Sequence, residues 1–439
     1  MKCRFVIPAG VCVLLLLLVP GTAASQTLLT ETTWGGAGAE FAEDVATAAD
    51  GSAYAVGLTD SFAIDEFGTP APRIFLVKFA TTGSIVWQRI WNGTTIRNLG
   101  RPAVAVGGDG SVFVTGTTAT NGGDAVLLKY SADGTLLWER TWGGSESDRG
   151  HAVAAAPDGS AYIAGTATSF GPSSAGLFVV KFDGAGNLVW QRISDNASGD
   201  AVAVGPDGSV FAAGSTPRDD LANFDVLVVK LTAAGTEVWR RTYSAGDVVD
   251  VRGRMAAAQD GSIVLAGAIQ AEKRGFVGID TLIFKLSQDG NLVFNRVFGG
   301  GDTAEAVAVA PDDGSIYVAG TTSRAGAGFQ DAFVLHLQST GKKALSAVTW
   351  GGAGFEEGRG VAVAGGSVVL AASTTNPPPY SLLDTAPKLS TPKSILAVAA
   401  GAIADVTGVV GNPALGAAIP NGSTTYAGNF EAAVVRMLR

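Results

Sequence analysis

A short motif recurs along the chain at nearly constant spacing, and it restricts the possible folds more than any other feature of the sequence. The motif is an Asp-Gly turn followed by alternating side chains, as in DGSVFVTG from Asp109 and DGSAYIAG from Asp158. The turn glycine stands at positions 51, 110, 159, 208, 261, 314 and 366, so the period is about 52 residues. A period of this length is typical of propeller blades and not of helical repeats.

Each repeat is predicted to form four short strands. Asp-Gly favours a tight hairpin between the first two strands, because both residues tolerate positive φ. The second strand carries an aromatic residue at one position: Tyr54, Phe113, Tyr162, Phe211 and Tyr317. The third strand has the form FLVKF from Phe75, and a second glycine turn leads into a Trp-rich fourth strand. The apolar residues and 60 glycines among 439 residues fit a turn-rich all-β protein.

The two ends of the chain are predicted to share one blade. The seventh repeat stops after a third strand, Phe430 to Leu438, and so lacks a fourth strand. Thr27 to Gly36 resembles Thr135 to Gly144, which is a fourth strand in another repeat. We therefore predict an all-β fold over residues 26–439: a seven-bladed β-propeller with four antiparallel strands per blade, the last blade closed by the N-terminal strand.

The fourth strands alternate Trp and Arg, as in Trp87, Arg89 and Trp91. Residues two apart lie on the same face of a strand. This face could form an aromatic cage for a cation. Packing between blades is the favoured interpretation, because a binding site needs the pattern once whereas packing needs it in every repeat.

The first 25 residues have the pattern of a secretory signal peptide. Lys2 and Arg4 precede an apolar run from Val11 to Val19, and small residues up to Ser25 follow. An uncleaved membrane anchor is the alternative, although the run is shorter than the roughly 20 residues that a spanning helix needs. We expect a secreted or periplasmic protein with no transmembrane segment after signal removal. Cys3 and Cys12 both lie in this segment, so a cleaved chain would have no disulfide, thiolate or Cys-based zinc site.

The repeat resembles a known bacterial family. The order TWGG, DGS-x-Y-V-x-G-T, D-A-F-V-x-K-L and G-x-L-x-W is similar to the secreted β-propeller repeat (SBBP repeat) over nearly all of the chain that follows the signal. The resemblance implies a propeller and no particular reaction. LVKFATTGSIVWQRIW from Leu76 is also similar to repeats of quinoprotein-like and outer-membrane-assembly propellers. The strict Asp-Gly-Ser hairpins favour the first family.

Motifs for catalysis are absent from the sequence. There is no GxSxG, HExxH or GxxxxGK[ST] pattern, and the glycines at 299–301 are followed by a strand rather than a helix. His336 replaces the lysine of the third strand, which indicates a structural role. His151 precedes a first strand, near the mouth of the ring, and is the better functional candidate. With a net charge of −9, a nucleic-acid partner is not expected.

Carboxylates gather in the loops that connect fourth and first strands. They are Glu40, Glu43, Asp44, Glu146, Asp148, Asp195, Asp200, Asp250, Asp302, Glu305, Glu356 and Glu357. A convergent pair could serve acid–base or glycosidase chemistry, or the oxygens could bind calcium, which no specific motif supports. The alternative is that these are ordinary turn residues. Our candidate binding residues at the channel mouth are Glu43, Asp44, Asp148, His151, Asp200, Glu305 and Glu356, with no catalytic, metal-binding or cofactor-binding residue assigned.

The last repeat contains an insertion at about 375–429 between its second and third strands. It begins with prolines at 377–379 and continues with an apolar stretch, from Ile395 to Val410, that suits either a helix or a hairpin. We expect it to lie across or beside the channel mouth; the alternative is a decoration of a blade edge. The interpretation we favour is an exported, monomeric, non-enzymatic scaffold that binds a protein or glycan on one face. A polysaccharide hydrolase or lyase and a periplasmic envelope-assembly factor are the alternatives.

Overall fold

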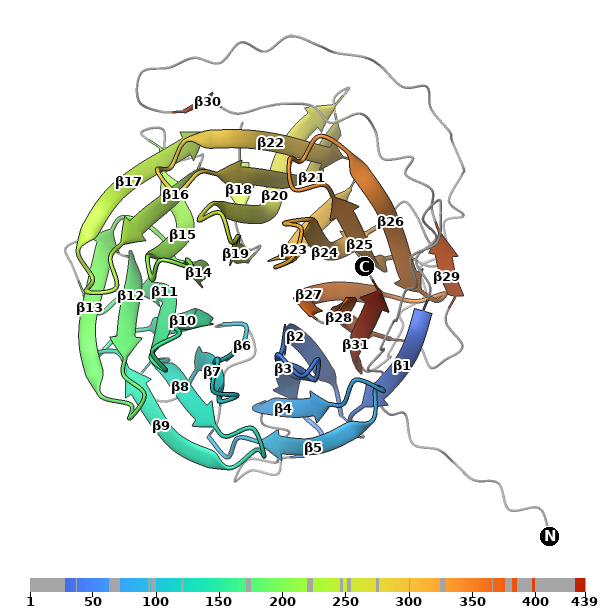
Figure 1. The fold of residues 1–439 in the computed structure, drawn as a ribbon, viewed down its shortest axis with the longest axis horizontal. Coiled ribbons are helices and arrows are strands. Elements are labelled where there is room, and N and C mark those ends of the chain that lie inside the picture. The colour runs from blue at the N-terminus through green and yellow to red at the C-terminus, as the bar shows by residue number, and fades with distance from the viewer. Residues whose placement is uncertain are drawn as a thin grey trace.

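The computed structural model describes most of the chain after residue 27. The described residues are 28–36, 38–62, 72–93, 95, 100–119, 122–170, 175–218, 224–244, 248–250, 254–273, 276–299, 301–323, 329–364, 366–375, 381–384, 397–398 and 431–438. The predicted signal peptide and most of the insertion lie outside this part of the chain. The described strands stand in a ring around a central axis (Figure 1).

These strands form seven antiparallel sheets, which we number in chain order. Sheet 1 contains β2 (Glu40–Thr47), β3 (Ala53–Thr59), β4 (Arg73–Phe79) and β5 (Ile85–Ile90). Sheet 2 contains β6 (Ala103–Val106), β7 (Val112–Thr117), β8 (Ala125–Tyr130) and β9 (Leu136–Trp142). Sheet 3 contains β10 (Asp148–Ala155), β11 (Ala161–Ala167), β12 (Gly176–Phe182) and β13 (Leu188–Asp195).

The remaining sheets vary this plan by added or divided strands. Sheet 4 contains β14 (Ala201–Val204), β15 (Val210–Pro217), β16 (Phe224–Leu231), β17 (Glu237–Ser244) and β30 (Ala397–Val398). Sheet 5 contains β18 (Val248–Asp250), β19 (Met255–Ala257), β20 (Ile263–Lys273), β21 (Phe276–Leu286) and β22 (Leu292–Gly299). Sheet 6 contains β23 (Asp302–Val309), β24 (Ile316–Thr322), β25 (Asp331–Leu337), β26 (Ala344–Gly351) and β29 (Ser381–Asp384). Sheet 7 contains β27 (Glu356–Ala364), β28 (Ser367–Thr374), β31 (Glu431–Leu438) and β1 (Leu28–Trp34). The predicted all-β propeller with four antiparallel strands per blade is confirmed.

The Asp-Gly turns form as the sequence predicts. Gly51 has a φ of 79°, in the region that glycine adopts at little cost. The Asp50 carboxylate accepts hydrogen bonds from the Ser52 amide at 2.8 Å and from its hydroxyl at 2.6 Å. These two bonds lower the pKa of Asp50, because they favour its charged form. The Asp-Gly-Ser sequence therefore fixes the turn by side-chain bonds as well as by glycine.

Sheet 7 joins the two ends of the described chain. β1 pairs antiparallel with β31, with Trp34 opposite Ala432, and β31 pairs with β28. The Thr32 hydroxyl donates to the Gly83 carbonyl of sheet 1 at 2.7 Å. The predicted closure by the N-terminal strand is confirmed, and β1 also bonds to the sheet that follows it in the ring.

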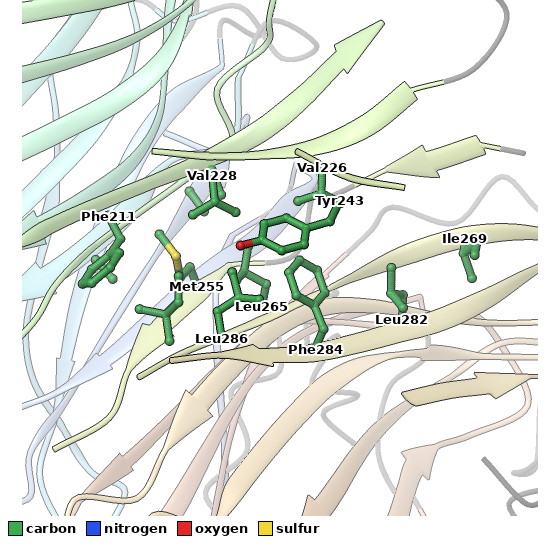
Figure 2. Packing of buried hydrophobic residues seen from close by; sticks show 14 of the residues in the cluster. Phe211, Val226, Val228, Tyr243, Met255, Leu265, Ile269, Leu282, Phe284 and Leu286 are labelled. Atoms are coloured by element: carbon green, nitrogen blue, oxygen red, sulfur yellow. The ribbon is translucent and has the colours of Figure 1, made fainter. Parts of the chain in front are cut away.

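Apolar clusters lie between neighbouring sheets. Figure 2 shows the cluster between sheets 4 and 5, where Tyr243 and Phe211 face Phe284 and Leu265. The Tyr243 hydroxyl donates to the Gly290 carbonyl at 2.6 Å, so its polar atom is satisfied inside the cluster. Because each cluster uses residues from two sheets, a blade buries its apolar faces only when its neighbours are present.

Sheets 1 to 4 each carry a Lys on the third strand and a Trp and an Arg on the fourth strand, which we call the Lys-Trp-Arg set. This set connects each sheet to the next one. In sheet 2, Lys129 and Trp138 donate to the Gly184 carbonyl at 3.1 Å, and Arg140 donates to the Gly186 carbonyl at 2.7 Å. Equivalent bonds to the next turn come from Trp87 and Arg89, Trp190 and Arg192, Trp239 and Arg241, and from Arg296. The packing interpretation of the Trp-Arg pattern is confirmed, since these rings and guanidiniums hold backbone carbonyls of the next blade.

The set is missing where sheet 6 meets sheet 7. His336, Ser346 and Val348 occupy the positions of the Lys-Trp-Arg set, as the strand register shows. The His336 ring stacks on Tyr317 with centroids 4.2 Å apart, and burial lowers its pKa to about 4, so the side chain is uncharged at neutral pH. In sheet 7 the third and fourth strands come from opposite ends of the sequence, so no turn joins them. Sheet 7 therefore offers no turn for a Lys-Trp-Arg set of sheet 6 to bind, and sheet 6 has no such set.

The described parts of the insertion lie on the outer edge of the ring. β29 pairs with β26, and β30 pairs with β17 (Figure 1). For these two segments a position over the mouth of the ring is wrong, and the alternative of a blade-edge decoration describes them. The other insertion residues, including most of the apolar stretch, lie outside the described part. No helix of the described residues is long and apolar enough to cross a membrane.

Candidate functional site

The two ends of the ring carry different connections. Asp-Gly hairpins and the second glycine turns lie at one end, which we call the turn face. Loops from fourth to first strands meet loops from second to third strands at the other end, which we call the loop face. Backbone bonds join them: Asp60 donates to Ala39 at 2.9 Å, Thr168 to Ser147 at 3.0 Å and Phe329 to Gly354 at 3.1 Å.

Four first strands begin with a carboxylate, and bonds to these carboxylates hold several of the loops. Asp148 is fully buried and accepts bonds from the amides of Gly144, Thr168 and Ser169 at 2.7 to 3.1 Å. Glu356 is also fully buried and accepts from the Gly352 amide at 3.0 Å and the Thr374 hydroxyl at 2.9 Å. Glu40 and Asp302 begin β2 and β23 in the same way.

Asp148 and Glu356 were predicted as binding residues at the channel mouth. The structure corrects this prediction, because both side chains are buried beneath the loops. Their oxygens accept hydrogen bonds from loop amides in the interior. The physical reason is that a tight Gly-Gly loop leaves backbone amides without partners, and a carboxylate satisfies several of them at once.

Four of the innermost strands contain a bulge. The register shifts between Ala42 and Asp44, and likewise in β10, β23 and β27. The residues left without a cross-strand partner are Glu43, His151, Glu305 and Arg359. A bulge bends the strand and re-aims its side chain. Asp200, Arg254 and Arg101 lie one or two residues before β14, β19 and β6, so every innermost strand has an ionisable residue here.

These side chains form a chain of ion pairs across four sheets. Arg101 of sheet 2 contacts Glu43 of sheet 1 at 3.6 Å and bonds Glu305 of sheet 6. Arg359 of sheet 7 lies 3.7 Å from the same Glu305 carboxylate and bonds Glu357. The contact between Arg101 and Glu305, which are 204 positions apart, therefore connects distant parts of the ring.

Arg254 makes a second connection through the centre. Its guanidinium lies 3.1 Å from the Asp44 carboxylate and donates to the carbonyls of Glu43 and Pro102 at 3.3 and 3.2 Å. Asp44 also accepts the Val104 amide at 2.9 Å. Sheet 5 is thereby joined to sheets 1 and 2. We call Glu43, Asp44, Arg101, Arg254, Glu305, Glu357 and Arg359 the central charge network.

Burial and neighbouring charges shift acidities within this network. Burial raises the pKa of Asp44, although Arg254 and the Val104 amide oppose that effect. Burial would lower the pKa of Arg359, but Glu43, Glu305 and Glu357 outweigh it and raise the pKa above its usual range. Arg359 therefore stays charged at any pH at which the protein folds, and it keeps the surrounding carboxylates compensated.

His151 and Asp200 lie together between sheets 3 and 4. The Nδ1 atom of His151 is 2.7 Å from the Gly199 carbonyl oxygen and 3.7 Å from the Asp200 carboxylate. Because a carbonyl only accepts, the proton lies on Nδ1. The pair joins two neighbouring blades.

Sequence reasoning missed the three arginines. The candidates from the sequence were carboxylates and a histidine, while Arg101, Arg254 and Arg359 fall at nearly the same place in their repeats. Placing the repeats in register at this one position would have shown an ionisable residue in each of the seven repeats, three of them arginines. At the centre of this acidic face, three guanidiniums compensate most of the charge of four carboxylates. No group of three or more His, Cys, Asp or Glu able to hold a metal occurs among the described residues.

Exposed phenylalanines occur farther out on the loop face. Phe62 is 47% exposed and Phe329 is 56% exposed, although each rests on another ring, Trp34 at 5.5 Å and Phe355 at 5.4 Å. Phe224 begins β16 and is 39% exposed. Such rings combine large apolar area with little flexibility, which is typical of binding anchors. Nothing in the sequence patterns had singled them out.

The fold defines the chain as a β-propeller protein. No family model and no curated protein matches it. Among solved structures it is similar to the WD40 domain of Neurospora crassa Pan2, with a TM-score of 0.47 and 11% identity over 76% of this chain and 86% of that one. It is also similar to the propeller domain of the trilobed protease of Pyrococcus furiosus, with a TM-score of 0.44 and 11% identity over 76% and 89% of the two chains. A Dos1 propeller gives a TM-score of 0.42 and 11% identity over 76% and 82%. These similarities concern the fold alone.

Proposed function

We propose that this protein is an exported scaffold without catalytic activity that binds a protein or glycan partner on its loop face. The exposed phenylalanines carry this proposal, because Phe62, Phe224 and Phe329 present aromatic area to solvent on one face. Aromatic side chains supply most of the binding energy in many interfaces, and they stack on sugar rings as well. The secretory pattern of residues 1–25 supports export.

The central charge network favours binding over catalysis. A glycosidase needs one protonated and one free carboxylate at the substrate. Glu43, Asp44 and Glu305 each face an arginine, and Asp148 and Glu356 are bonded to loop amides. Every one of these carboxylates has a structural partner, so a hydrolase or lyase has no specific support. No observation favours an envelope-assembly factor over other partners.

The test compares two surfaces of the same protein. Purified residues 26–439 are immobilised and presented with envelope proteins and with extracted polysaccharide. A Phe62→Ser, Phe224→Ser, Phe329→Ser variant should lose the captured partner, whereas Leu137→Ser, which changes an exposed residue near the turn face, should keep it. Melting temperatures establish that both variants fold. Equal capture by both variants, or loss in the Leu137 variant alone, would contradict the proposal.

A further inference from the structure

The interface between sheets 6 and 7 is held differently at its two ends. At the loop face, the Glu356 amide of sheet 7 donates to the Gln330 carbonyl of sheet 6 at 2.9 Å. At the turn face, His336, Ser346 and Val348 stand at the positions of the Lys-Trp-Arg set, which in other sheets binds carbonyls of the next turn. The turn-face end therefore lacks the set of contacts that joins sheet 2 to sheet 3.

Three polar side chains lie in one row at this end of sheet 6. The register places Tyr317 of β24 opposite His336 of β25, and His336 opposite Ser346 of β26. The Tyr317 hydroxyl, the His336 Nε2 atom and the Ser346 hydroxyl are buried, and none has a hydrogen-bond partner among the described residues. Buried polar atoms without partners cost free energy, so this row holds its interface less firmly than a Lys-Trp-Arg set does.

The surroundings of His336 favour its neutral form. Its ring stacks on Tyr317, and burial raises the pKa of Tyr317, which therefore stays uncharged. On the side of sheet 7, Tyr317 packs in one cluster with Val361 and Val368, which are apolar. Among the described residues, the charge that acts on His336 is that of Asp313 in the neighbouring turn. It raises the pKa of His336, but burial outweighs it and lowers that pKa to about 4.

Protonation of His336 is unfavourable while the interface is closed. It adds a charge that Asp313 offsets only in part, and in the imidazolium both ring nitrogens carry a proton, so the buried Nε2 atom would donate to no acceptor among the described residues. In an open interface, water solvates the ring and its pKa returns to the ordinary value of about 6.5. Between these two pKa values the open form binds more protons, so opening becomes more favourable as the pH falls through this window.

We propose that the turn-face end of this interface is an acid-sensitive seam, which is closed while His336 is neutral and opens when His336 takes up a proton. The loop-face end stays joined through Glu356 and Gln330, so sheet 7 moves away from sheet 6 about that end. Sheets 1 to 5 carry a lysine at the position of His336, and lysine side chains do not ordinarily titrate between about pH 4 and 7. The seam does not depend on the partner proposed for the loop face.

Single cysteines measure the opening, because residues 26–439 contain no natural cysteine. Val368→Cys places a thiol in the seam, and Ala161→Cys places one at the same repeat position between sheets 2 and 3; both sites are fully buried. The labelling rate with a pyridyl disulfide is divided by that of the exposed Leu137→Cys at the same pH, which removes the effect of pH on the thiol. From pH 7 to pH 5 the corrected rate at position 368 should rise about 20-fold, as pKa values of about 6.5 and about 4 require. The rate at position 161 should not rise. An equal rise at both positions, or none at position 368, would overturn the proposal.

Histidine variants connect the opening to His336. His336→Phe keeps a ring on Tyr317 but cannot titrate, so in this background the rise at position 368 should disappear. His151→Gln removes the other histidine of residues 26–439 and should leave the rise unchanged. A rise that persists in His336→Phe, or that His151→Gln abolishes, would overturn the proposal. An NMR titration of the natural protein tests it without these variants: the pKa of His336 should lie well below about 6.5, and a value at or above that would also overturn it.

Discussion

Charged side chains at the centre of the ring are held by opposite charges from distant sheets. Arg254 is the clearest case, since it joins Asp44 to the carbonyls of Glu43 and Pro102. A buried ion pair adds little over an apolar pair of the same shape, but removing one partner leaves an uncompensated charge. The network therefore acts mainly by allowing one arrangement of the inner strands.

Arg254→Leu is expected to lower the free energy of unfolding by about 3–5 kcal/mol at pH 7. The pKa of Asp44 is already raised by burial and should rise further without Arg254. A raised carboxyl pKa means that the folded state binds more protons than the unfolded state between the two pKa values. Stability of the variant should thus recover as the pH falls through that window. Urea unfolding at pH 7, 5 and 4 measures it.

The double variant Asp44→Asn with Arg254→Leu is the control for this experiment. Without an ionisable group at position 44, the recovery at low pH should disappear. A loss in the single variant that is the same at every pH would show that Arg254 acts by packing alone.

Arg140 represents the locks between neighbouring blades. It donates to the Gly186 and Ala185 carbonyls and lies over Trp138 at 5.6 Å. Arg140→Leu should lower the free energy of unfolding by about 1.5–3 kcal/mol, because hydrogen bonds from a charged group contribute that much. Thr141→Ala, at an exposed position of the same strand, should change stability by less than about 0.5 kcal/mol. Denaturant midpoints of the two variants measure the difference. Equal midpoints would show that Arg140 does not stabilise the contact between the blades.

Among the elements, β1 connects the two ends of the described chain. It completes sheet 7. Thr32 occupies the repeat position that Arg140 has in sheet 2. It donates to the Gly83 carbonyl of sheet 1, as Arg140 donates to the Gly186 carbonyl of sheet 3. Deleting residues 28–34 should uncover the edge of β31 and lower the melting temperature, with aggregation as a consequence. Size-exclusion chromatography and thermal unfolding measure both effects.

Replacing residues 376–429 by a short Gly-Ser link is the control for that deletion. The corresponding loops in other repeats are short, so the ring should still close and remain folded. An unchanged melting temperature after loss of β1, or collapse after loss of the insertion, would reverse the roles that the pairing assigns to them.

Sequence periodicity predicted the strands well because each turn is encoded locally. Asp50, Gly51 and Ser52 determine a hairpin through their own bonds and dihedral angles. The same locality explains the failures. The polar residues around Asp148 are typical of an exposed loop, yet its carboxylate accepts hydrogen bonds from amides about 20 residues away. The partners of Glu305 are Arg101 and Arg359, whose contact depends on ring closure and leaves no signal within a single repeat.

For the whole molecule, export remains a prediction from the sequence. Cleavage is expected near Ala24 or Ser25, since small residues precede that point. The new N-terminus would then lie just before β1, whose first residue is Leu28. N-terminal sequencing of the protein recovered outside the cytoplasm measures this, and an intact Met1 on that material would contradict it.

The pairing of β1 with β31 also bears on how the ring folds. Leu28 lies opposite Met437, so the first described strand has its partner at the far end of the sequence. A chain that emerges N-terminus first holds β1 without that partner until every other blade has been made. Contacts between such distant residues form slowly. We therefore expect closure to be the last step of folding, and a circular permutant that joins residues 438 and 28 through a short turn should refold faster than the natural order.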